Sequence, residues 1–111
     1  MYLHDLFGSE TAEKVLLFLQ NYKSGYGQKI AKTYGISISQ VQKQLLKLEH
    51  SGILVSHLIG KTRLFQWNPR YMFLAELQAL LDKALENMPA DYAQKYYRQR
   101  MRPRRTGKPL P

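Results

Sequence analysis

Polar side chains between residues 37 and 47 are of types that recognise other molecules by hydrogen bonding. On a helix, at about 100° per residue, they face away from an apolar stripe of Ile38, Val41, Leu45 and Leu48. Gln pairs with adenine through two hydrogen bonds, Ser donates or accepts, and Lys reaches guanine or phosphate. A polar face alone is typical of a solvated helix, but together with the turn and the hairpin described below it predicts a face that reads base edges in a DNA major groove. Its members are Ser37, Ser39, Gln40, Lys43, Gln44 and Lys47. Gln44 lies toward one flank of this face, and Gln42, which we do not include in it, lies toward the other.

No motif in the sequence indicates catalysis or binding of a cofactor or metal. Gly60-Lys61-Thr62 resembles the end of a phosphate-binding loop, but Val55 occupies the position where that loop requires glycine. The histidines His4, His50 and His57 lack the spacing of a helical metal pair, and the chain has no cysteine. We expect neither an enzyme nor a bound cofactor or metal.

Two helices joined by a tight turn position the reading face. The turn is indicated by three residues at relative positions i, i+4 and i+10, namely Ala31, Gly35 and Val41. Ala31 is the small residue where the two helices cross, Gly35 allows the turn, and the branched Val41 packs against the first helix. The predicted helices are 27–34 and 37–51, the second closed by Gly52. Strands at 53–55 and 64–67 then form a hairpin, with Gly60-Lys61 in a type II′ turn. Its register pairs Leu54 with Trp67, and Ser56 with Phe65.

This pattern resembles the winged-helix bacterial and archaeal regulators of the ArsR and MarR type over about residues 6–85. The resemblance is carried by Ile30-Ala31, Gly35-Ile36-Ser37, Ser39, Val41, Leu45, Leu48-Glu49 and Gly52-Ile53-Leu54-Val55. It implies a sequence-specific double-stranded DNA-binding regulator. In such a fold the wing tip residues Lys61, Thr62 and Arg63 contact phosphate or the minor groove. Tyr26 and Gln28 are candidates for holding phosphate at the start of the 27–34 helix.

Further helices are expected on either side of this region. Ser9 can cap a helix over 10–22, and Asn68-Pro69 can start a long helix reaching about residue 87. The apolar surface of the long helix predicts a homodimer that places two reading helices about 34 Å apart on a palindromic site. The alternative is packing of this helix within its own chain, against Phe7, Val15 and Leu19. The predicted dimer residues are Phe73, Leu74, Leu77, Leu81 and Leu85.

The net charge of +9 favours a nucleic-acid partner, and seven basic residues follow Asp91. A helix is expected over 91–101. The arginines of this basic tail are candidates for a nucleic-acid arm, while a solubilising end, a partner-binding segment and a membrane-surface patch are alternatives. They are Arg98, Arg100, Arg102, Arg104 and Arg105.

The predicted fold class is therefore mainly α with a small β-hairpin: a winged helix-turn-helix with a long C-terminal dimerisation helix. Residues 1–68 form the DNA-binding domain, 69–88 the dimerisation helix, and 89–111 a basic helix and disordered tail. A dimeric repressor fits this organisation best. The alternatives are a protein-interaction adaptor or antitoxin, with a partner bound through the C-terminal region, and an RNA-binding protein. No apolar stretch approaches the ~20 residues that cross a bilayer, and we expect a cytoplasmic protein without membrane association.

Overall fold

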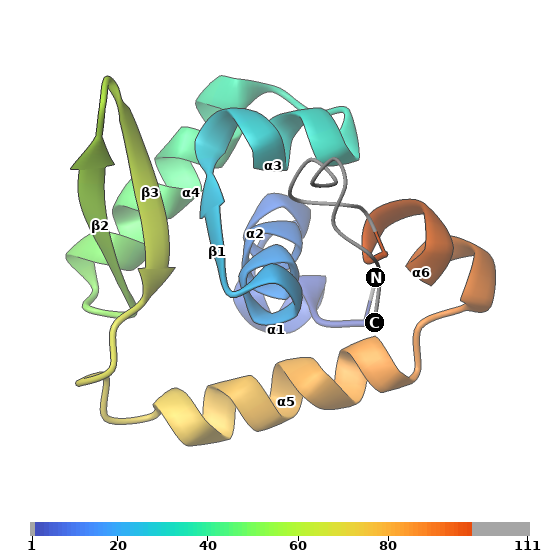
Figure 1. Cartoon of the computed structure of the whole chain (residues 1–111). Helices are drawn as coiled ribbons and strands as arrows, with labels where there is room; N and C mark the ends of the chain where they lie inside the picture. The colour runs from blue at the N-terminus through green and yellow to red at the C-terminus, as the bar shows by residue number, and fades with distance from the viewer. Residues whose placement is uncertain (1, 99–111) are drawn as a thin grey trace, which may run out of the picture.

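The computed structural model describes residues 2–98 (Figure 1). Helices surround a small antiparallel sheet, whose strand order is β1-β3-β2. The elements in chain order are α1 (His4–Phe7), α2 (Glu10–Tyr22), β1 (Ser24–Tyr26), α3 (Gly27–Tyr34), α4 (Ile38–His50), β2 (Leu54–Ile59), β3 (Thr62–Trp67), α5 (Leu74–Glu86) and α6 (Ala90–Tyr96). None of the helices within residues 2–98 is long and apolar enough to cross a membrane.

Helix α2 forms the centre of the molecule. Ser9 caps it, because the Ser9 hydroxyl accepts a hydrogen bond from the Ala12 N–H at 3.0 Å. Its side chains are buried in several directions, and Val15, Phe18 and Leu19 have no exposed surface. The α2 helix contacts α3, α4 and β1 on one side and α5 on the other (Figure 1). One core therefore joins the helix-turn-helix to the C-terminal helices.

The predicted turn between α3 and α4 is confirmed. Gly35 adopts a φ of +66°, a left-handed conformation that glycine adopts without steric strain. The Ile36 N–H donates to the Ala31 carbonyl at 3.0 Å and closes the end of α3. Val41 and Leu45 of α4 are fully buried in the core. The outer face of α4 is thereby turned to solvent.

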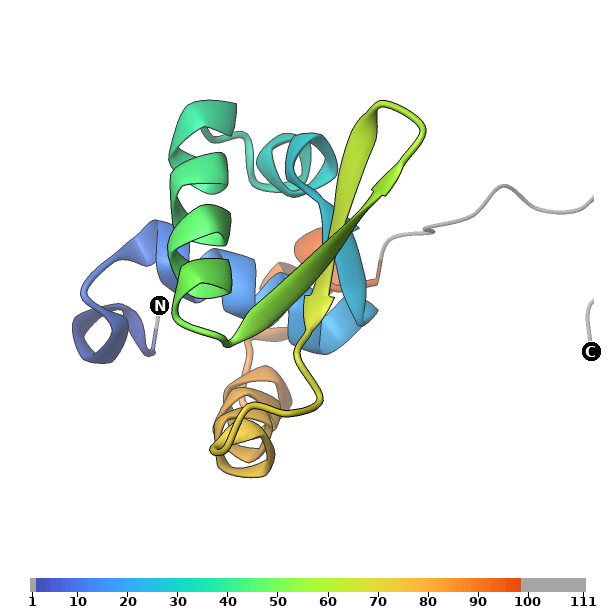
Figure 2. The same cartoon turned by 90° about the vertical axis from the view of Figure 1, so that its left-hand side faces the viewer.

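The hairpin register is also as predicted, with Leu54 opposite Trp67 and Ser56 opposite Phe65. The backbone φ is +61° at Gly60 and is not positive at Lys61, as a type II′ turn requires. The Trp67 indole N–H donates to the Leu19 carbonyl at 3.3 Å. The hairpin is therefore fastened at its base, while its tip extends from the body (Figure 2).

The sequence does not predict the short strand β1, which a single residue separates from the end of α2. Lys23 supplies the left-handed turn conformation, with φ +76°, and Gly25 lies in strand β1, opposite Phe65 of β3. A Cβ atom on Gly25 would come within 2.7 Å of the Phe18 ring. Glycine is required here because the strand passes directly over a buried aromatic ring.

The predicted start of the long helix at Pro69 is wrong. The Asn68 carboxamide oxygen accepts from the Arg70 N–H at 3.0 Å, and its amide donates to the Gly52 carbonyl at 2.8 Å. These bonds fix a turn at 68–70 that joins the end of the hairpin to the segment after α4. Helix α5 consequently begins only at Leu74.

Helix α5 packs on its own chain, as the alternative interpretation of the sequence held. Leu81 is fully buried, and Ala84 and Met88 are nearly so, within the same core as α2. Leu81 is therefore a core residue and not a dimer contact. Leu74, Leu77 and Leu85 are partly buried against the core, whereas Phe73 is exposed.

A cluster of tyrosines attaches α6 to the helix-turn-helix. The Tyr34 and Tyr97 hydroxyls are 3.0 Å apart in a hydrogen bond, and both residues are buried. Tyr22 donates to the Tyr96 carbonyl, and the Asn21 amide donates to the Tyr97 carbonyl at 2.8 Å. These bonds end α6 at Tyr96, five residues before the predicted end at 101.

Burial raises the pKa of both Tyr34 and Tyr97 well above the ordinary value of 10.0. Above pH 10 the unfolded chain releases these protons while the folded chain retains them. The free energy of unfolding should therefore fall, by about 1.4 kcal/mol per pH unit for each tyrosine. Urea denaturation at pH 9, 10 and 11 measures this slope, and Tyr97→Phe should reduce it. An identical slope for Tyr97→Phe and the unmodified chain would contradict this assignment.

Candidate nucleic-acid interface

A cleft of about 380 Å³ opens between α4, the start of α3 and the hairpin. Figure 2 shows α4 and the hairpin diverging from their short connection, with α3 between their open ends. The cleft brings together five residues that the sequence predicted to contact the DNA backbone, from two separate segments of the chain. They are Tyr26, Gln28, Lys61, Thr62 and Arg63.

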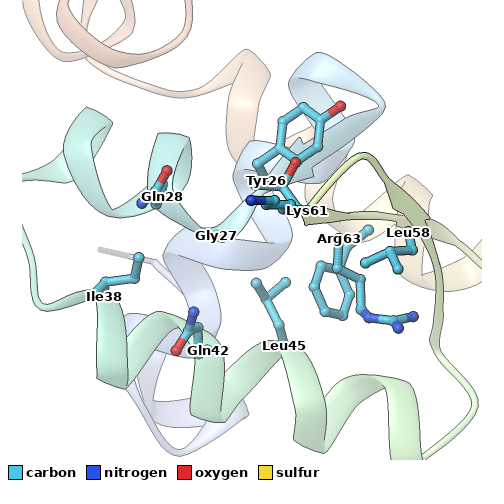
Figure 3. A pocket seen from close by; sticks show the side chains of 11 residues that line it. Tyr26, Gly27, Gln28, Ile38, Gln42, Leu45, Leu58, Lys61 and Arg63 are labelled. Atoms are coloured by element: carbon cyan, nitrogen blue, oxygen red, sulfur yellow. The ribbon is translucent and has the colours of Figure 1, made fainter.

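The α4 side of this cleft is formed by residues that the sequence-based prediction did not include. Figure 3 shows Ile38 and Gln42 projecting from α4 into the cleft, toward the start of α3. A second, smaller cavity of about 180 Å³ continues along α4 between Gln42, Leu46 and the hairpin residues Arg63 and Phe65. Gln42 therefore lies at the junction of the two cavities.

Most of the predicted reading face is exposed along α4. Ser39, Gln40, Lys43 and Lys47 are exposed, and the Ser39 hydroxyl shares a 2.7 Å hydrogen bond with that of Ser37. Gln44 differs, because it is half-buried, and it does not line the cleft. Among the three glutamines of α4, Gln42 is the one directed toward the hairpin.

The wing side chains are held by hydrogen bonds within the protein. Arg63 donates to the Ser56 hydroxyl at 3.1 Å, and Ser56 donates to the Glu49 carboxylate at 2.5 Å. This chain of bonds links β3 and β2 to α4 and holds the Arg63 guanidinium beside the cleft. The Thr62 hydroxyl donates to the Ile59 carbonyl at 3.1 Å and so supports the hairpin turn. The Lys61 side chain is exposed at the tip.

Charge is concentrated in the segment that builds the cleft. Residues 24–71 contain seven Lys and Arg but one acidic residue, a net charge of +6, whereas residues 1–23 and 72–98 each carry −1. The single acidic residue, Glu49, is half-buried and accepts the Ser56 hydrogen bond. Counting charges by segment would have revealed this asymmetry, which is hidden when the whole chain before the tail is counted together.

The part of the chain that the structure describes contains no candidate metal centre. Within residues 2–98, no three His, Cys, Asp or Glu side chains are grouped so that they could hold a metal ion.

Of the predicted tail arginines, Arg98 is exposed, and its guanidinium lies 3.5 Å from the Gln94 carboxamide oxygen. Arg100, Arg102, Arg104 and Arg105 lie outside the described residues.

The helix-turn-helix, the hairpin and the strand β1 together define a winged helix-turn-helix protein, which confirms the predicted mainly α fold with a small β-hairpin. The dimerisation role of the C-terminal helix stays a prediction. Two solved structures are similar to the chain, both of a double mutant of ZitR from Lactococcus lactis. The structure in apo form has a TM-score of 0.54 and 19% sequence identity, and covers 76% of this chain and 67% of that chain. The other has a TM-score of 0.51 and 17% identity, and covers 75% and 64%.

This likeness shows a shared fold, and this chain spans about two thirds of the length of those chains. The resemblance to regulators of the ArsR and MarR type in particular stays a prediction. No protein-family model matches the sequence, and no curated protein matches it.

The hydrogen bonds at Ser56 yield a stability prediction. Ser56→Ala removes the donor to the Glu49 carboxylate and the acceptor for Arg63, and should lower the free energy of unfolding by about 1 to 2 kcal/mol. Urea denaturation measures the loss. Ser51→Ala is the matched control, because the exposed Ser51 hydroxyl bonds only to the Lys47 carbonyl at the end of α4, and it should cost less than about 0.5 kcal/mol. Equal losses in the two variants would show that the Glu49-Ser56-Arg63 chain does not stabilise the wing.

Proposed function

We propose that this protein is a sequence-specific regulator that binds double-stranded DNA. The observation that carries the proposal is the cleft, where five predicted phosphate-contacting side chains converge beside the exposed polar face of α4. The surrounding segment has a net charge of +6, which attracts the phosphate backbone and favours counterion release.

In the proposed complex, α4 enters the major groove. Its 13 residues form a rod about 20 Å long, and the diameter of a helix with its side chains, about 10 to 12 Å, fits a major groove about 12 Å wide. One DNA strand would cross the cleft between α4 and the hairpin, with its phosphates near Tyr26, Gln28 and Lys61. The backbone N–H groups at the start of α3 favour the same anionic partner. Arg63 and Thr62 would then lie toward the adjacent minor groove.

Base discrimination is assigned to the exposed face of α4. Ser39, Gln40 and Lys43 present a hydroxyl, an amide and an ammonium group to the groove, and Lys47 continues the face toward the end of the helix. The tail arginines would add affinity for any sequence by neutralising phosphate. Specificity would then come from α4, while the electrostatic attraction would come from both the segment around the cleft and the tail.

We further propose that the protein acts as a dimeric repressor, blocking a palindromic site. The surface available for dimerisation is smaller than the sequence suggested, because α2 covers much of α5. What stays exposed is an apolar patch that begins just before α5 and reaches the middle of this helix. It consists of Met72, Phe73 and Leu80. The competing function is that of an adaptor, in which a different protein binds this patch.

Substitution of the proposed reading face tests DNA recognition. Gln40→Ala with Lys43→Ala should abolish the preference for a selected duplex over a random one while leaving the fold intact, since both side chains are exposed. The two polar contacts together should account for at least a tenfold preference. Gel-shift titrations with duplex DNA and RNA at several salt concentrations measure this. The matched control is Gln78→Ala with Lys83→Ala on α5. Specific binding that survives the α4 substitutions, or a preference for RNA, would refute the proposal.

The dimer is tested by sedimentation equilibrium of the full chain at micromolar concentration without DNA. We expect about twice the chain mass of 13.0 kDa. Phe73→Glu should give the monomer mass with unchanged circular dichroism, because this exposed side chain contributes to the proposed interface and not to the core. A monomer mass for the unmodified chain would contradict the proposed dimer and would favour binding of a different protein to the patch.

A further inference from the structure

The edge of α4 that faces the hairpin combines apolar side chains with one glutamine. Ile38, Gln42 and Leu46 are spaced four residues apart, so they form a single stripe along the helix. Ile38 is 38% exposed and Leu46 57% exposed, although both are apolar. On the opposite wall, Leu58 is 63% exposed. These side chains do not stabilise the core as Val41 and Leu45 do.

The chemistry of this stripe matches one class of base pair. In the major groove an A·T pair presents the N7 acceptor and N6 donor of adenine together with the C5-methyl group of thymine. A glutamine carboxamide satisfies the adenine pair, and aliphatic side chains bury the methyl group. A G·C pair offers no methyl group. The three side chains span about 12 Å of helix axis, or about three to four base-pair steps.

We infer that the Ile38-Gln42-Leu46 stripe reads A·T pairs, with Gln42 on adenine and Ile38 and Leu46 on thymine methyl groups. The inference rests on the proposed function and deepens it by naming the DNA sequence class. These residues are distinct from Gln40 and Lys43, which the sequence-based prediction assigned to base reading.

The surroundings favour DNA over a protein as the occupant of this edge. Lys61 and Arg63 border the cleft that Ile38 and Gln42 line, and Arg63 also borders the smaller cavity at Leu46. Lys43 is exposed on the same helix. The Glu49 carboxylate nearby accepts the Ser56 hydrogen bond. Phosphates flanking the bases would be neutralised here, whereas an apolar protein surface would have to desolvate these cations.

The test uses the full chain and a duplex selected by it from a random DNA pool. Each thymine of the selected duplex is replaced in turn by deoxyuridine, which removes the methyl group and preserves base pairing and hydrogen bonding. Affinity should fall about fourfold at one or more positions, as expected for the loss of one buried methyl group. Ile38→Ala or Leu46→Ala should abolish the effect at the corresponding position. Gln42→Ala should reduce the preference for A·T at its position by roughly tenfold or more.

Leu6→Ala is the matched control, because Leu6 is an exposed leucine on α1, and this variant should keep the full dependence on thymine. The inference is overturned if deoxyuridine is tolerated at every position, or if the dependence of affinity on thymine is unchanged in both Ile38→Ala and Leu46→Ala. In either case, specific binding to the selected duplex would still support the proposed function. A Leu46→Ala variant with unaltered affinity for the thymine duplex also overturns the inference and favours a protein partner at this edge. If no duplex is enriched by the selection, the proposed function fails together with the inference.

Discussion

Burial of α2 on more than one side is the constraint on which the other elements depend. A helix in a small protein usually buries one stripe, whereas 8 of the 13 residues of α2 are buried. Two layers must therefore cover it. The helix-turn-helix and the sheet cover one side, and α5 covers the other (Figure 1). Because α2 contacts α4 as well as α5, the orientation of α4 and the position of the C-terminal helices are set by the same packed side chains.

The elements that the sequence predicted well are those whose signals are local. Helix α2, helix α3 and the hairpin register follow from a cap, from glycines at turns and from alternating apolar residues. Strand β1 was missed because three residues show no periodicity, and the reason for Gly25 is a ring of Phe18 seven positions earlier. The start of α5 was misplaced since Asn68 bonds to Gly52, a partner distant in sequence, instead of capping the next helix.

The sequence indicated many of the residues that gather at the candidate site but not how they are oriented. A helical projection correctly separates the buried Val41 and Leu45 from most of the exposed polar positions on α4, but it placed Ile38 with the buried residues, and the structure leaves Ile38 exposed. The projection does not show which exposed edge faces the hairpin, because that depends on how the hairpin folds back beside α4. Gln42 was therefore left on a flank, although it lies where the two cavities meet, while Gln44 was included although it is half-buried. The five backbone-contact candidates come together only once strands and helices are placed in three dimensions.

Different side chains of α4 serve the core and the exposed edges, and this separation has an evolutionary consequence. Val41 and Leu45 stabilise the fold because they are fully buried, and the side chains on the exposed edges contribute less to its stability. In the proposed complex, a mutation at Ile38, Gln42 or Leu46 would therefore alter which base pairs are preferred without first requiring a compensating change in the core. A lineage with such a helix could pass from one target to another through stable intermediates, whereas substitutions at the buried positions of the same thirteen residues would lower stability.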